Sequence, residues 1–283
     1  MLRHFVLIVL FASITDWSTS YGGQEKSLEI VVEGRSFELS LSAMKQIEGL
    51  QEAIHTVKSP IYNKKKSYRG FDLLDLLKKS GYVKRPIKTL KFLCRDNYAP
   101  EIDLSLHALK LFIAFEEADK LGYFEPISEG KVVLNPQPFF VMTYRSEDFE
   151  TFAWPHQVMR VEVNPDEGKY LISANLSHKR HGKLSSEEKI AIEKGEKAFS
   201  QHCLACHSIN LHGGQIGPEL NIPKNITEYR DRDFLKQFIV NPRSFRARSR
   251  MLPMPHLKAE ELIHILSYLE HMKDEKVLTR LKD

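Results

Sequence analysis

Residues 203–207 read Cys203-Leu204-Ala205-Cys206-His207, and this stretch decides how the C-terminal third of the chain folds. Two thiols separated by two residues match the two vinyl groups of haem, and each thiol can form a thioether with one of them. The histidine that follows is then held beneath the ring, where its imidazole can bind the iron. The stretch therefore predicts one covalently attached haem c, with Cys203 and Cys206 as attachment points and His207 as an axial ligand.

The same cysteine pair also fits two other kinds of site, a redox-active dithiol and half of a zinc site. A structural zinc site needs further ligands, and the only other cysteine in the sequence, Cys94, stands alone. A thioredoxin-like dithiol lies at a strand-to-helix turn within a βαβ unit, whereas this pair follows a predicted helix. We favour haem over both alternatives.

The region around the motif has helical patterning and predicts an all-α domain over residues 185–274. Ser185 and Glu188 form a capping box for a helix that runs to about His202. Apolar residues at helical spacing predict a middle helix over 234–239 and a last amphipathic helix over 262–272.

This region resembles class I c-type cytochromes across about residues 184–274. Gly195 lies on the helix before the motif and Tyr268 on the last helix, where the family crosses these two helices closely. A glycine at such a crossing lets the two backbones approach. The resemblance also implies that the carbonyl of Pro218 orients the axial imidazole of His207, as metal-bound histidines generally require.

The resemblance implies a methionine as the second axial ligand, supplied from downstream. Alignment on Leu257 and Glu260 gives Met251 that position. One residue separates Met251 from the next proline, which departs from the family's Met-Pro order and keeps Met254 as the alternative. Either methionine is preferred to His256, because a thioether opposite histidine raises the reduction potential, as an electron carrier needs.

A basic segment precedes these methionines and has two interpretations. It is either a solvated loop or a set of cations that pair with haem propionates or an acidic partner. Its arginines are Arg243, Arg246, Arg248 and Arg250. Four other histidines, His178, His181, His202 and His212, are expected at the surface.

The first part of the chain predicts a mixed α+β domain over residues 28–164. Its expected elements are a hairpin over 28–41, a helix over 71–80 that ends at Gly81, and strands within 88–98, 131–145 and 156–164. Composition then becomes polar and aperiodic, which predicts a linker over residues 165–184.

Within this domain, Ser67-Tyr68-Arg69-Gly70-Phe71 and the sequence that follows look like the sulfite-oxidase-type molybdopterin-binding fold. Enzymes of that fold hold molybdenum with a cysteine upstream of the corresponding motif, and residues 50–70 contain none. His55 and Tyr62 lack a thiolate's combination of charge and softness, and Cys94 lies downstream in a predicted strand with the pattern of a buried thiol. We therefore expect a degenerate scaffold without molybdopterin.

The first residues predict export. A short positive head precedes an apolar run of signal-peptide length, and Ser18-Thr19-Ser20 offers a small-x-small cleavage site. We expect residues 1–20 to be removed and the mature chain to be periplasmic or otherwise exported. The formal charge of +4 is mixed along the sequence, without a clustered basic and aromatic surface, so nucleic acid is not an expected partner.

Together these features predict a single-haem cytochrome that transfers electrons to and from redox protein partners, with peripheral association with membrane electron-transfer proteins as an option. Its first domain would bind a partner or a small ligand. The alternative is a molybdenum-dependent oxidoreductase that passes substrate electrons to its own haem, and a haem-based sensor is a weaker third class. We favour the electron carrier over an enzyme, and metal analysis separates the two.

Overall fold

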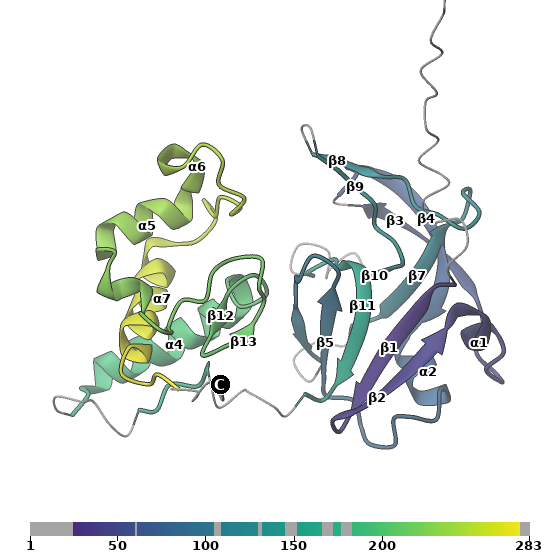
Figure 1. Ribbon diagram of the computed structural model, residues 1–283, viewed down its shortest axis with the longest axis horizontal. Helices are drawn as coiled ribbons and strands as arrows, with labels where there is room; N and C mark the ends of the chain where they lie inside the picture. Colours follow the sequence, from purple (N-terminus) through teal and green to yellow (C-terminus); the bar gives the residue numbers. More distant parts are fainter. Residues whose placement is uncertain are drawn as a thin grey trace, which may run out of the picture.

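The computed structural model describes residues 25–59, 61–104, 109–129, 132–144, 152–165, 172–176 and 183–277. The predicted signal peptide, residues 1–20, lies outside these ranges. Figure 1 shows the strands up to β11 with helices α1 and α2 on one side, and helices α4 to α7 on the other. The expected order of an α+β region followed by a helical region is confirmed.

The first region is built on one large sheet. Among the described residues it contains nine strands, in the order β2-β1-β11-β10-β7-β4-β3, with β5 paired to β11 and β6 paired to β5. The strands are β1 (Ser27–Val32), β2 (Arg35–Ser40), β3 (Ala53–Ser59), β4 (Lys64–Asp72), β5 (Thr89–Cys94), β6 (Glu101–Asp103), β7 (Leu111–Glu117), β10 (Phe139–Thr143) and β11 (His156–Val163). Strands β1 and β11 pair in parallel and the other pairs are antiparallel. A separate hairpin joins β8 (Ile127–Glu129) and β9 (Val132–Leu134).

The first hairpin forms where the sequence predicts it. Ser27 pairs with Ser40 and Val32 with Arg35, so a two-residue turn closes the strands. Both turn residues, Glu33 and Gly34, have positive φ angles of 51° and 73°. Two positive φ angles match the right-handed twist of the flanking strands, which is why such turns connect hairpins.

Strands β3, β4 and β7 are missing from the sequence prediction. Their backbones pack tightly at Gly70, because a Cβ there would lie 2.1 Å from the carbonyl oxygen of Ile113 in β7. Any side chain would push β4 away from β7. The glycine of the Tyr68-Arg69-Gly70 motif is therefore explained by close packing of two strands.

The described residues of the first region include the short helices α1 (Leu41–Lys45) and α2 (Leu73–Lys79). The Asp72 carboxylate caps α2 by accepting the Asp75 N–H at 2.9 Å. The chain leaves the helix through Gly81 at φ 78°, as predicted. Leu73, Leu76 and Leu77 are fully buried and join α2 to the sheet core.

The second region is mainly helical, with four helices that surround its own apolar core. They are α4 (Ser186–His202), α5 (Arg232–Val240), α6 (Pro242–Phe245) and α7 (Ala259–Met272), with the 3-10 turn η3 (Ile226–Glu228). Both bonds of the predicted Ser185 and Glu188 capping box are present. The region is not purely α-helical, because β12 (Ser208–Ile209) and β13 (His212–Gly213) form a small hairpin after the motif.

Helices α4 and α7 cross at Gly195. A Cβ on Gly195 would lie 2.0 Å from the carbonyl oxygen of His264 and 2.8 Å from the Cβ of Tyr268. Ordinary contact between such atoms is 3.4 Å or more. The glycine therefore sets how closely the first and last helices of this region approach.

Part of the predicted linker packs against these helices. Ile172 is buried in the helical core, and its carbonyl accepts a 2.6 Å hydrogen bond from the hydroxyl of Tyr268. The Glu196 carboxylate accepts the Ala174 N–H at 2.9 Å. Among the described residues, no helix has the length and apolar character needed to cross a bilayer.

Candidate functional site

The predicted attachment motif folds as one tight turn at the end of α4. Cys203 caps the helix, with its N–H bonded to the carbonyl of Phe199 at 2.8 Å. The N–H groups of Cys206 and His207 both donate to the Cys203 carbonyl, at 3.1 and 2.9 Å. The two thiols and the imidazole therefore arise from a single backbone turn.

Both thiols of this turn are free, as covalent haem attachment requires. Cys203 is buried and Cys206 is half-buried. Burial raises the pKa of the Cys203 thiol to about 12 and also raises the pKa of Cys206. Because the thiolate is the nucleophile, both cysteines are poorly reactive in the folded chain.

The imidazole of His207 is held by one nitrogen. Its Nδ1 lies 2.9 Å from the carbonyl oxygen of Pro218, the residue predicted to orient it. Burial lowers the pKa of His207, which favours the neutral imidazole. Because Nδ1 serves as donor to Pro218, Nε2 carries the lone pair that a metal needs.

Gly217 makes room for this ring. A Cβ at position 217 would lie 2.3 Å from Cε1 and 2.5 Å from Nδ1 of His207. A side chain would displace the imidazole from the Pro218 carbonyl. The residues present therefore fit haem: two free thiols for its vinyl groups and a histidine with Nε2 available to iron.

Glu219 fixes the loop that contains Pro218, and the sequence prediction missed it. Its carboxylate accepts hydrogen bonds from four backbone N–H groups at 2.8 to 3.2 Å. The donors are Asn210, Leu211, Asn221 and Ile222. The Glu219 side chain thus provides the hydrogen-bond acceptor for backbone N–H groups on both sides of the loop, next to the Pro218 carbonyl that orients His207.

A ladder of buried amides ties the same loop to the last helix. Asn221 donates to the side chain of Asn210 at 2.9 Å, and Asn225 donates to Asn221 at 2.7 Å. Asn225 also donates to the carbonyl of Leu269 in α7 at 2.9 Å. A fully bonded polar network of this kind holds one arrangement of the loop against the helix.

The two candidate methionines lie on one segment beside the helical core. Met251 and Met254 are both half-buried and pack against the core cluster. The Met254 N–H donates to the carbonyl of Ile239 at 3.2 Å, which fixes the segment to α5. The structure brings both thioethers to this region, and the choice between them stays a prediction.

The predicted exposure of the arginines and histidines near the site agrees with the structure for some residues and differs for others. Arg243, Arg246, Arg248 and Arg250 are all exposed. His212 is not at the surface as expected, since it is 7% exposed within β13 of the small hairpin. His202 is half-buried, with its ring centroid 5.7 Å from that of His256. His178 and His181 lie outside the described residues.

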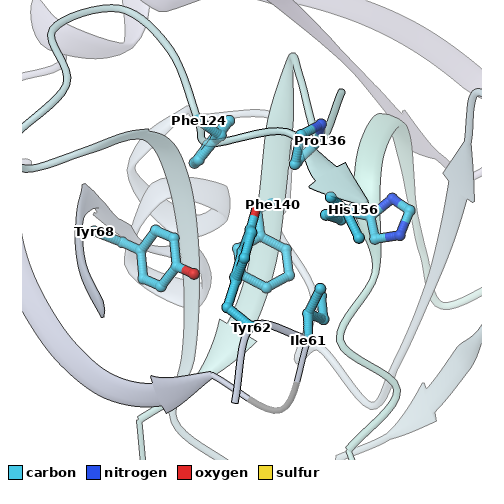
Figure 2. Close-up of a pocket in the computed structure, with 8 residues that line it drawn as sticks. Ile61, Tyr62, Tyr68, Phe124, Pro136, Phe140 and His156 are labelled. Carbon is cyan, nitrogen blue, oxygen red and sulfur yellow. The ribbon is translucent and has the colours of Figure 1, made fainter. Parts of the chain in front are cut away.

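A small pocket lies inside the first region, close to the Tyr68-Arg69-Gly70 motif. It is too narrow to admit a water molecule and is lined by Ile61, Tyr62, Tyr68, Phe124, Ile127, Pro136, Phe140 and His156. Figure 2 shows the Tyr68 hydroxyl directed towards Tyr62 and Phe140, while the His156 ring points away from them. The Tyr68 hydroxyl is buried and makes no hydrogen bond among the described residues.

Charged residues border this pocket. The ammonium of Lys66 lies 4.0 Å from the centre of the Tyr62 ring and 2.5 Å from the Glu117 carboxylate. Lys66 and Glu117 are both buried, at 5% and 3% side-chain exposure. The pair neutralises two charges that would otherwise be costly inside the protein.

The candidate substitutes for a molybdenum-binding thiolate are dispersed. His55 stacks on Tyr144 with ring centroids 4.0 Å apart, and it is not among the residues that line the pocket. Cys94 is 2% exposed and does not line the pocket either, so only Tyr62 does. The pocket leaves no room for even a water molecule, whereas typical cofactor sites measure about 300–1,000 Å³.

Comparison with known families identifies the second region. The family model described as cytochrome c matches residues 192–273. The match confirms the expected resemblance of this region, and the sulfite-oxidase-type resemblance of the first region stays a prediction. No curated protein matches the chain.

Proposed function

We propose that this chain, which contains a cytochrome c domain at residues 192–273, is an exported single-haem cytochrome that transfers electrons one at a time. Bound haem supplies an iron that gains and loses one electron. The turn that unites two free thiols with His207, whose Nδ1 is 2.9 Å from the Pro218 carbonyl, carries the proposal. Cys203 and Cys206 would hold the haem and His207 would bind its iron.

The second axial ligand in this proposal is Met251, with Met254 as the alternative. A thioether opposite histidine favours ferrous iron and so raises the reduction potential. Both residues lie beside the helical core on the segment anchored at Ile239. A methionine as second axial ligand suits an electron carrier, whereas an open axial position on the iron would suit a haem-based sensor.

We further propose the arrangement of the whole chain. Residues 1–20 would direct export to the periplasm, residues 28–164 would form the first domain, residues 165–184 the linker and residues 185–274 the haem domain. Redox proteins are the proposed partners, docked by charge pairing to the exposed arginines that precede Met251. Such pairing predicts electron-transfer rates that fall as salt increases.

The first domain is proposed to be a scaffold that binds a partner or a small ligand and holds no molybdopterin. The pocket beside its Tyr68-Arg69-Gly70 motif is too narrow to admit a water molecule and has no thiol among its lining residues. The Tyr62 hydroxyl donates a hydrogen bond to the carbonyl of Glu125, so it already has a partner. The residues present therefore do not fit a thiolate-bound molybdenum.

Covalent attachment is the direct test of the proposed function. Purified from a host that matures c-type cytochromes, the protein should stay red after denaturation and acid-acetone extraction. Changing Cys203 or Cys206 to alanine should weaken attachment, and the double change should abolish it. Cys94→Ala is the matched control, because it removes the third cysteine and should leave attachment intact. Free extraction of haem from the unmodified protein would refute the proposal.

Elemental analysis separates the carrier from the enzyme. Expression in a host competent for both cofactors should give iron without molybdenum. Near-stoichiometric molybdenum alongside iron, lost on Cys94→Ser, would establish the oxidoreductase alternative instead. The expected result leaves the first domain as a binding scaffold next to the haem.

A further inference from the structure

A turn of the first domain contacts the haem attachment motif. The turn follows β5, and its Ala99 N–H donates to the carbonyl of Ala205 at 3.0 Å. The Gln215 N–H in turn donates to the carbonyl of Asn97 at 3.2 Å. Ala205 lies between the two attachment cysteines, so the contact is made to the motif itself. Figure 1 shows β5 on the side of the sheet that faces β12 and β13.

The turn keeps its shape through bonds within its own domain. The Asn97 N–H donates to the Cys94 carbonyl at 3.0 Å, and the Cys94 N–H donates to the Tyr98 carbonyl at 2.9 Å. The Asp96 side chain accepts the Tyr98 N–H at 3.0 Å, and Asn97 has a φ of 68°. Because β5 is part of the main sheet, the turn is held at the motif by a rigid element.

The motif is equally well held on its side of the contact. A Cβ on Gly214 would lie 2.0 Å from the carbonyl oxygen of Ala205, so this position requires a glycine. The Gly214 N–H donates to Leu204 at 2.8 Å, and the Gly217 N–H donates to Cys206 at 2.7 Å. Two preformed surfaces therefore meet at the Ala205 carbonyl.

Tyr98 anchors this turn to the first domain, because its side chain packs against the core cluster of that domain. It is half-buried, and its neighbours Ala99 and Pro100 are buried. Burial is the main cause that raises the pKa of Tyr98, and the Cys206 sulfur is the next. Packing of this ring fixes the turn from the side of the first domain, and the next residue, Ala99, donates its N–H to the Ala205 carbonyl.

We infer that Tyr98 is a positioning residue of the haem site: the turn that it anchors covers the attachment motif at Ala205 and excludes water there. This inference rests on the proposed function. Ferric haem carries one more positive charge than ferrous haem, and water stabilises that charge. Excluding water from the haem favours the reduced state and raises the reduction potential. The first domain thus raises the reduction potential of the haem in the second domain.

The test is a redox titration of the full holoprotein with Tyr98→Ala, Tyr98→Phe and Tyr123→Ala. Tyr98→Ala should lower the midpoint potential, shifting the ratio of reduced to oxidised haem by about threefold to tenfold, where tenfold equals ~59 mV for one electron. Tyr98→Phe keeps the ring and should stay near the unmodified value. Tyr123, on the same domain, is 50% exposed and serves as the matched control.

A second measurement on the unmodified holoprotein decides the matter if Tyr98→Ala does not fold. The amide hydrogens of Ala99 and Gln215 should exchange slowly, because both bridge the two domains. Rapid exchange of both amides, or an unchanged potential in folded Tyr98→Ala, overturns the inference. If haem is still covalently bound, rapid exchange or an unchanged potential overturns this inference alone and leaves the proposed function intact. If haem is lost on extraction, the proposed function itself is refuted.

Discussion

Gly195→Ala should destabilise the cytochrome domain, although alanine is the better helix former. Helix propensity alone predicts a gain of about 1 kcal/mol in the free energy of unfolding. The new Cβ would lie 2.0 Å from the His264 carbonyl oxygen and 2.6 Å from its carbon. Overpacking costs about 1–3 kcal/mol, and more where backbone has to move. Since both close atoms are backbone, we expect a net loss of about 2 kcal/mol.

Denaturant titration of the holoprotein, followed by far-ultraviolet circular dichroism and haem absorbance, measures this change. Lys197→Ala is the matched control on α4, since Lys197 is exposed and its change should stay within about 0.5 kcal/mol. A Gly195→Ala protein as stable as the unmodified one, or more so, would mean that propensity outweighs packing. The conclusion that α4 and α7 approach too closely at position 195 for any side chain would then be wrong.

Three further changes test the other parts of the structure. Met251→Ala should remove the weak near-infrared sulfur-to-iron band of the oxidised protein and lower the potential, whereas Met254→Ala should leave the band; the opposite result makes Met254 the ligand. Lys66→Met should lower the unfolding free energy of the first domain by about 3 kcal/mol, because it removes the cation 2.5 Å from the buried Glu117 carboxylate and leaves Lys120 at 3.9 Å; a denaturation midpoint that does not move would contradict this. Glu219→Gln should cost about 1.5–3 kcal/mol in the same assay, since an amide cannot replace a carboxylate that accepts four N–H groups, and no loss would make those bonds unimportant.

Local signals in the sequence predicted the elements that depend on local bonds. Ser185 and Glu188 lie three residues apart, and both of their capping bonds form. Gly81 follows the predicted helix and takes the positive φ that ends it. These outcomes were predictable because each depends only on residues within one turn of the chain.

The missed strands depend on partners far away in the sequence. Residues 64–66 are three consecutive lysines and look like a solvated loop, yet Lys66 is buried in β4. Its charge is neutralised by Glu117 of β7, 2.5 Å away, and no periodicity reveals that pair. The cost of burying a charge makes the loop the better guess until the partner is known.

The candidate site also combines features that local sequence predicts with features that depend on distant residues. The spacing of Cys203, Cys206 and His207 predicts an attachment site, and the structure brings the three residues together on one turn, with Nδ1 of His207 2.9 Å from the Pro218 carbonyl. The role of Glu219 requires four backbone groups on two strands of a loop, which only the fold brings together. A glutamate directly after a Gly-Pro pair was the one signal available in the sequence.

The position of Gly195 also has a consequence for the order in which the chain folds. The close crossing joins the first and last helices of the cytochrome domain, so its core closes only after residue 272 has been synthesised. Contacts between distant segments form late, because a long loop must first be closed. In the folded domain Cys203 is buried, and this burial raises the pKa of its thiol to about 12, which disfavours the reactive thiolate. We expect the interval before α7 docks to be the time in which haem can be joined to the chain.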